Sequence, residues 1–276
     1  MDRPPRPRRA WNRLPPERAS AIVDLALAEP SLSPRELAVK YTDTRRYYVC
    51  ESTVYRILKA QDLIASPAFI VLQAADRFQH PSTRVHQLWQ TDFTYLKVIG
   101  WGWFYLSTVL DDYSRFILAW RLCSGMAASD VSATLEQALA FAALQRATVV
   151  HRPRLLSDNG PSYVSAELAT WLKARAMPHT LGKPYHPMTQ GKIERWHRSL
   201  KSEILLENHY LPGQLESAIG RFVEYYNHDR YHESLDNLTP ADVYYGRGTK
   251  ILKMRRKIKQ RTMKERRRLH RQHKVA

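Results

Sequence analysis

The sequence predicts a mixed α/β sheet with flanking helices, preceded by a small all-α domain and followed by a basic tail. Three observations lead to this prediction. Residues 89–122 hold three apolar, β-rich runs joined by short connections. Apolar runs of helical period then alternate with short strand-like runs as far as residue 208. Finally, the excess positive charge lies only at the two ends of the chain.

That charge distribution limits the class of partner. The chain carries 43 Lys and Arg against 26 Asp and Glu, a net charge of +17. Residues 247–276 hold 14 Lys and Arg against one acid, whereas residues 19–246 hold 23 bases and 23 acids. A neutral body with a basic N-terminal arm (1–16) and a basic tail (247–276) suits a polyanion such as nucleic acid. The alternative is a tail that only keeps the chain soluble.

The cysteines and apolar runs exclude several other classes. Cys50 and Cys123 stand far apart and form neither a metal-binding pair nor a disulfide framework. This fits a reducing compartment, and we expect a cytoplasmic, nucleoid-associated protein. The charged N-terminus lacks the apolar run of a signal peptide. A stretch of about 18 apolar residues, which a membrane span would need, is also missing.

Residues 17–64 predict short helices of the helix-turn-helix type. Ser33, followed by a proline and then by Glu36, has the spacing of a capping box at a helix start. A helix over residues 50–64 would turn a polar face outward and place it in a DNA major groove. That face consists of Thr53, Arg56 and Lys59. A helical cap without DNA contact is the alternative. Residues 65–84 lack periodicity and are predicted to be a linker.

The core is predicted over residues 85–246. Its first three strands form an antiparallel meander, because the connections between them are short. We expect most tryptophans of this region to lie in the core. The elements expected in chain order are strands 90–98, 103–111 and 115–122, helix 129–145 with Ser129 as its N-cap, strand 152–158, helix 164–177, strand 178–182 and helix 189–208.

Three acids stand at ends of these elements. Asp92 lies in the first core strand, Asp158 ends the fourth, and Glu194 lies one turn into the last helix. If the first and fourth strands are neighbours, the two aspartates meet and the helix can bring Glu194 across them. Three converging carboxylates repel one another unless cations lie between them. Oxygen ligands of this kind favour Mg²⁺ or Mn²⁺, and two such ions about 4 Å apart support in-line phosphoryl transfer.

Spacing alone is moderate support, since any of the 26 acids can be a helix cap or a surface ion-pair partner. The flanking residues are more specific. The segments WQTDFTYL, VLDDYSRFILAW, LLSDNGPSYVS and HPMTQGKIERWHRSLKSE, with 35 residues between Asp158 and Glu194, resemble the DDE transposases of bacterial insertion sequences, most closely the IS3 and IS481 groups. YYNHDRYHESLDNLTPADVYYG resembles the end of their catalytic region. The resemblance covers roughly residues 30–246.

The resemblance implies an RNase H-like fold with a retroviral-integrase-like core. It implies that Asp92, Asp158 and Glu194 are the catalytic ligands of two Mg²⁺ or Mn²⁺ ions. It also implies cleavage of double-stranded DNA at the element ends, strand transfer into a target, and at least a dimer on DNA. An upstream product of a frameshifted gene pair is a further expected partner. The zinc module of retroviral integrases has no counterpart here, because two lone cysteines cannot supply it.

Several polar residues near the acids have two interpretations. The basic residues around Glu194 either grip the DNA backbone or form an ordinary solvated face; they are Lys192, Arg195, Arg198 and Lys201. Asp111 and Asp112 are expected mainly to shape a hairpin turn. Asn159 and His186 either touch substrate or belong to loops. Two rival functions remain, a structure-specific nuclease on the same fold and a domesticated DNA-binding regulator.

Overall fold

The structure, a computed structural model, describes residues 11–64, 82–144, 152–182 and 190–275. The chain divides into two compact units. The first contains residues 1–73 and 247–276, and the second contains residues 74–246. Among the described residues, no helix combines the length and the apolar character that crossing a membrane requires.

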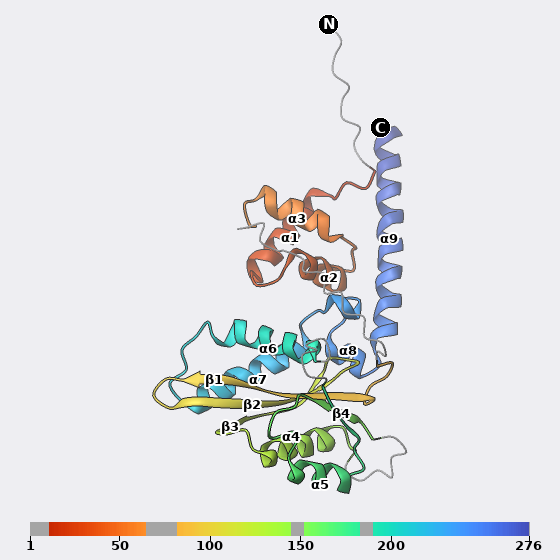
Figure 1. The fold of residues 1–276 in the computed structure, drawn as a ribbon. Coiled ribbons are helices and arrows are strands. Elements are labelled where there is room, and N and C mark those ends of the chain that lie inside the picture. The colour runs from red at the N-terminus through yellow and green to blue at the C-terminus, as the bar shows by residue number, and fades with distance from the viewer. Residues whose placement is uncertain (1–10, 65–81, 145–151, 183–189, 276) are drawn as a thin grey trace. The chain divides into compact units, whose positions relative to one another are not determined.

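A five-stranded mixed sheet forms the centre of the second unit, with the strand order β3-β2-β1-β4-β5 (Figure 1). Strands β1 (Leu88–Val98), β2 (Gly102–Asp111) and β3 (Ile117–Cys123) form the predicted antiparallel meander. Strand β4 (Arg154–Ser157) runs parallel to β1, and β5 (His179–Leu181) runs parallel to β4. The first and fourth strands are therefore neighbours, as the placement of the acids required.

Helices cover both faces of this sheet (Figure 1). On one face, α4 (Ala128–Phe141) and α5 (Ala166–Ala174) bury a cluster that includes Trp89, Val109 and Leu135. On the other, α6 (Gly191–Ile204) and α7 (Pro212–His228) bury Leu110, Trp196 and others. A 3₁₀ turn (Glu233–Leu235) and the short helix α8 (Pro240–Tyr244) follow. The predicted mixed α/β fold class is confirmed.

One local prediction in this unit is wrong. Helix α4 begins after Ala127 rather than at Ser129, because the Asp130 carboxylate reaches back and accepts a hydrogen bond from the Ala127 N–H at 3.1 Å. The prediction that most tryptophans lie in or against the core is confirmed. The exceptions are Trp101, in the turn between β1 and β2, and Trp103, near the start of β2, which are 62% and 53% exposed. The turn tightens at Gly100, whose φ of 84° is open to glycine at no steric cost.

In the first unit, three helices share a small core. They are α1 (Pro16–Ala28), α2 (Pro34–Arg45) and α3 (Glu51–Ala60). The predicted capping box at the start of α2 is confirmed: the Ser33 Oγ accepts from the Glu36 N–H at 3.3 Å, and the Ser33 N–H donates to the Glu36 carboxylate at 3.0 Å. Their buried side chains include Ile22, Leu37, Tyr41, Val54 and Leu58.

The basic C-terminal segment forms one long helix in this unit, α9 (Gly248–Val275). Arg255 binds the Asp43 carboxylate of α2 at 2.6 Å. Arg266 donates to the Tyr47 hydroxyl at 2.9 Å and to the Tyr48 carbonyl at 2.8 Å. Part of the tail's charge is therefore used to attach α9 to the small helical core. The predicted boundaries of the arm, the linker and the domains remain predictions.

A buried amide on α7 ties that helix to β3. The Asn227 side chain accepts from the Ile117 N–H at 2.9 Å and donates to the Ile117 carbonyl at 3.1 Å. We predict that Asn227→Ala lowers the free energy of unfolding by about 1–3 kcal/mol, because both backbone groups lose their partner. Urea denaturation measures this, with Asn208→Ala at an exposed site as the control. Equal midpoints for both variants would contradict the assignment.

Candidate active site

The strand register brings Asp92 and Asp158 together. Strands β1 and β4 pair in parallel up to Gln90 opposite Leu156. Two residues further along each strand, Asp92 faces the position of Asp158, and neighbouring strands lie about 4.8 Å apart. The recorded pairing of β1 with β4 ends at Gln90 and Leu156, two residues before the aspartates.

The turn after β4 holds the Asp158 carboxylate in place. Its Oδ1 accepts a hydrogen bond from the Gly160 N–H at 2.9 Å, and the carboxylate is otherwise exposed. The Asn159 side chain donates to the Gly182 carbonyl at 2.8 Å and so fastens the turn to the segment after β5. A Cβ at position 160 would lie 3.0 Å from Asp158 Oδ1, so glycine permits this close turn. Asn159 thus has a loop role here.

Helix α6 brings Glu194 beside Asp92. Asp92 and Glu194 line one groove of about 640 Å³, together with Arg198 and Lys201 from α6. Burial raises the pKa of Glu194, and the nearby Asp92 charge raises it further. Two carboxylates that repel each other in one groove are the arrangement that a bound cation stabilises.

These carboxylates do not form a closed cluster by themselves. Within the described parts of the chain, no three His, Cys, Asp or Glu side chains lie close enough together to hold a metal ion. The donor types nevertheless fit a divalent cation that prefers oxygen ligands. Asp92 and Glu194 share the groove, and Asp158 is one strand away from Asp92.

Two further residues at this site were missed by sequence reasoning. Tyr163 is buried, which raises its pKa well above the usual value, and the charges of Asp92 and Asp158 raise it further. Its hydroxyl therefore lies in the field of both aspartates. His197 places Nδ1 at 3.5 Å from Asp92 Oδ2. Its position three residues after Glu194, on the same helix face, was the one available signal.

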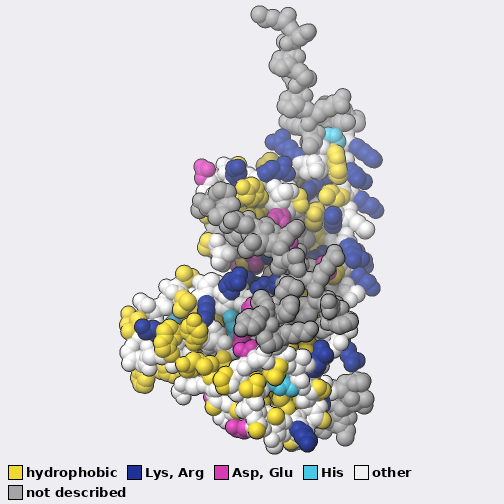
Figure 2. Space-filling model, in the orientation of Figure 1, with side chains coloured by type: hydrophobic (Ala, Val, Ile, Leu, Met, Phe, Trp, Pro, Cys, Tyr) yellow, Lys and Arg dark blue, Asp and Glu magenta, His cyan; other side chains and the backbone are white. Residues whose placement is uncertain are grey.

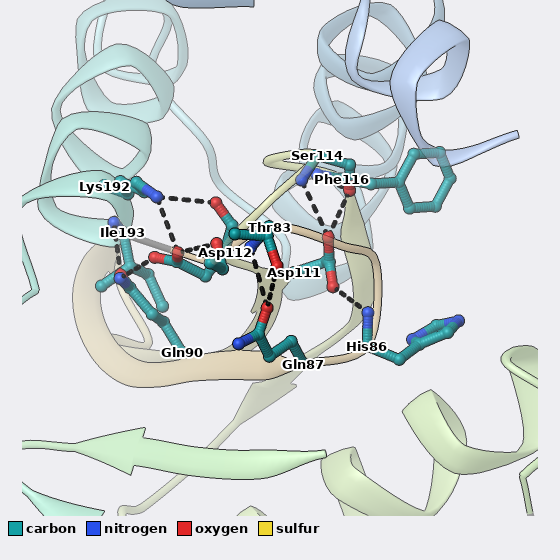
Figure 3. A network of polar contacts seen from close by, with 11 residues as sticks. Thr83, His86, Gln87, Gln90, Asp111, Asp112, Ser114, Phe116, Lys192 and Ile193 are labelled. Atoms are coloured by element: carbon teal, nitrogen blue, oxygen red, sulfur yellow. Dashed lines mark hydrogen bonds and ion pairs between the residues drawn. The ribbon is translucent and has the colours of Figure 1, made fainter. Parts of the chain in front are cut away.

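A buried polar network fixes α6 against the sheet, as Figure 3 shows. Gln90 donates to Asp112 Oδ1 at 2.7 Å and accepts from the Ile193 N–H at 3.1 Å. The Lys192 ammonium donates to Asp112 Oδ2 at 2.7 Å and to the Asp112 carbonyl at 2.8 Å. Gln90, two residues before Asp92, is thus hydrogen-bonded to Ile193, the residue before Glu194.

The network also separates the roles of two neighbouring acids. Asp111 accepts from the Ser114 N–H at 2.8 Å and the Ser114 hydroxyl at 2.6 Å, which is the expected turn role. Asp112 instead holds Lys192, whose side chain is only 14% exposed. Burial lowers the pKa of Lys192, and Asp112 opposes that change. The ammonium group of Lys192 is engaged inside the protein, which favours a structural role for this residue over the predicted DNA contact.

The other residues predicted to bind DNA are distributed over both units. Arg198 and Lys201 line the groove beside Glu194, whereas Arg195 is half-buried. On α3, Arg56 and Lys59 are exposed and Thr53 is half-buried, so the polar face predicted there is present. His186 lies outside the described residues.

Two family profiles, both described as integrase core domain, match residues 82–187 and 175–240. Together they cover more than half of the chain, including all three acids. The chain belongs to the integrase core family.

Curated relatives of this integrase-core protein include transposases of insertion sequences and retroviral polyproteins. It is 30% identical to the transposase for insertion sequence element IS629 of Shigella sonnei over 61% of this chain and 56% of the relative. It is 26% identical to that for IS904 of Lactococcus lactis over 58% of this chain and 62% of the relative. The chain thus spans somewhat more than half the length of these relatives. A magnesium-bound HTLV-2 integrase catalytic core is similar at a TM-score of 0.47, with 18% identity, over 59% of this chain and 99% of that core.

Removing the Lys192 ammonium group from the network around Asp112 should destabilise the folded chain. We predict that Lys192→Met lowers the free energy of unfolding by about 3–5 kcal/mol, because it leaves the buried Asp112 carboxylate without its positively charged partner. The double variant Asp112→Asn with Lys192→Met should recover part of this loss, since no uncompensated charge remains. Urea denaturation compares the three proteins. A single variant as stable as the wild type would show that the pair does not hold α6.

Proposed function

We propose that this chain is a DNA transposase that cleaves the ends of an insertion sequence and transfers the freed 3′ ends into a target. The observation that carries the proposal is the convergence of Asp92 and Glu194 on one groove, with Asp158 at the facing position of the neighbouring strand. The names of the relatives support it, because they are transposases of insertion sequence elements.

Divalent ions, when bound by Asp92, Asp158 and Glu194, would supply charge neutralisation for the reacting phosphate; we propose two Mg²⁺ or Mn²⁺ per site. The chain's own residues position the substrate. The His197 Nδ1 lies 3.5 Å from one oxygen of Asp92, and we propose that this contact orients the carboxylate. Arg198 and Lys201 line the groove and bind phosphate oxygens of the strand. No serine or tyrosine nucleophile is needed, since the attacking group is water or a DNA hydroxyl.

The remaining parts of the proposal concern recognition and assembly. The exposed face of α3 reads the element end through Arg56 and Lys59, and the basic helix α9 contacts DNA without sequence preference. Two element ends must be brought together, so the chain acts as at least a dimer on DNA. An upstream frameshift product as a partner and a cytoplasmic, nucleoid-associated location belong to the same proposal.

Substitution of the acids should separate chemistry from binding. We predict that Asp92→Asn and Glu194→Gln each reduce end cleavage and strand transfer to the background level, since the site loses a ligand charge. Binding to end DNA should remain. Glu203→Gln, at an exposed carboxylate on the same helix, is the matched control and should remain active. If the Asp92→Asn variant retained strand transfer, the proposed metal-dependent mechanism would be contradicted.

Ion binding has a readout that is independent of activity. We predict that saturating Mg²⁺ or Mn²⁺ raises the melting temperature of the wild-type chain, because a ligand at a hundred times its Kd stabilises the folded state by about 2.7 kcal/mol. The shift should be absent in Asp92→Asn and present in Glu203→Gln. An equal shift in all three proteins would place the ion elsewhere.

The salt dependence of DNA binding tests whether the exposed face of α3 contacts DNA. We predict that Arg56→Ala and Lys59→Ala each weaken binding of end DNA and reduce the slope of log K against log salt by about 1, since each lost phosphate contact releases about one counterion fewer. Arg35→Ala, on the neighbouring helix α2, is the comparison. Unchanged slopes for both α3 variants would favour the helical cap without DNA contact.

A further inference from the structure

One end of the sheet exposes aromatic rings that the proposed chemistry does not use. Along the last part of β1, buried and exposed residues alternate, and the exposed face carries Tyr95 and Lys97. Trp103 of β2 lies directly opposite Lys97 in the register. Tyr95 is 57% and Trp103 53% exposed. Figure 2 shows hydrophobic side chains gathered at the left of the view, over the hairpin end of β1 and β2, with basic side chains beside them.

The rings and the neighbouring cations form an ordered surface. The Tyr95 and Trp103 rings meet edge to face, with their centroids 5.3 Å apart and an interplanar angle of 80°. The Lys201 ammonium lies 4.1 Å from the centre of the Tyr95 ring, and that of Lys97 lies 6.0 Å from the Trp103 ring. We call Tyr95, Lys97, Trp103 and Lys201 the aromatic platform. Each ring therefore has a positive charge next to it.

Lys201 connects the aromatic platform to the groove that Asp92 and Glu194 line. This residue lines the groove with Asp92 and Glu194, and its ammonium group reaches the Tyr95 ring. Asp92 and Tyr95 point to opposite faces of β1 and are separated by about 10 Å along the strand, which equals about three base steps of DNA. Beyond Gln90, β1 pairs only with β2 among the described residues, so Lys201 passes a strand edge that no neighbouring strand covers.

We propose that the aromatic platform binds the unpaired nucleotides that adjoin the reacting phosphodiester. Bases stack on tyrosine and tryptophan whatever their identity, and the lysines match the charge of the strand's phosphates. The path from the groove bends round the edge of β1, which a single strand can follow and a stiff duplex cannot. Paired bases also keep their faces covered by their neighbours. The inference rests on the proposed function, because it assigns a subsite to the same DNA.

Direct binding measurements test the platform. The full-length chain is titrated with a fluorescein-labelled oligo(dT) strand and, separately, with a duplex of equal length. Tyr95→Ala and Trp103→Ala should each weaken single-strand binding about tenfold and change duplex binding by less than about twofold. Tyr95→Phe and Trp103→Phe keep a stacking ring and should bind like the wild type. Trp101→Ala, at an equally exposed tryptophan outside the two strands, is the matched control.

The outcomes separate this inference from the proposed function. If the wild type joins a pre-cleaved end to a target but the alanine variants bind oligo(dT) as tightly as it does, the platform is overturned and the transposase proposal stands. If Trp101→Ala weakens binding as much as Trp103→Ala, the effect belongs to the whole turn and the platform is again overturned. If the alanine variants instead lose self-association in sedimentation without losing oligo(dT) affinity, the face is a contact between copies. If the wild type never joins a pre-cleaved end to a target, the transposase proposal is overturned, but the binding of unpaired strands by the platform is not.

Discussion

The candidate site depends on the buried tie between β1 and α6. Asp92 and Glu194 belong to elements separated by about a hundred residues, and Gln90, Asp112 and Lys192 connect those elements beside both acids. Placing two carboxylates in one groove is electrostatically unfavourable in the absence of a cation. The fold must therefore hold α6 in place by other interactions, and these hydrogen bonds together with the buried face of Ile193 and Trp196 do so. The position of Glu194 relative to Asp92 therefore depends on the stability of this network.

Much of the second unit could be predicted from local patterns. Strand-like runs with short connections predicted the meander, and the order of strands and helices predicted the layers around it. Asp158 was recognisable because it directly follows an apolar run and precedes a turn. The N-cap of α4 was not, since Ser129 and Asp130 are both good capping residues and only the backbone geometry selects the carboxylate of Asp130. The family resemblance added the identity of the three acids, which spacing alone left among 26 candidates.

What the sequence could not supply came from contacts between distant residues. Lys192 has the same local context as Arg198, yet one is engaged by Asp112 and the other faces the groove. Tyr163 and His197 matter because of what folding places beside them, and no local pattern marks a tyrosine in the field of two aspartates. The basic tail likewise carried no sign that Arg255 and Arg266 would attach it to the small helical unit as a long helix.

The central claim is that Asp92, Asp158 and Glu194 form one binding site for divalent ions. It is tested most directly by a crystal structure of the chain with Mn²⁺ and a pre-cleaved DNA end, in which anomalous scattering locates the manganese. We expect manganese in contact with oxygens of all three side chains. Manganese bound elsewhere, with these carboxylates more than roughly 10 Å apart and so too far to share a pair of ions, would contradict it.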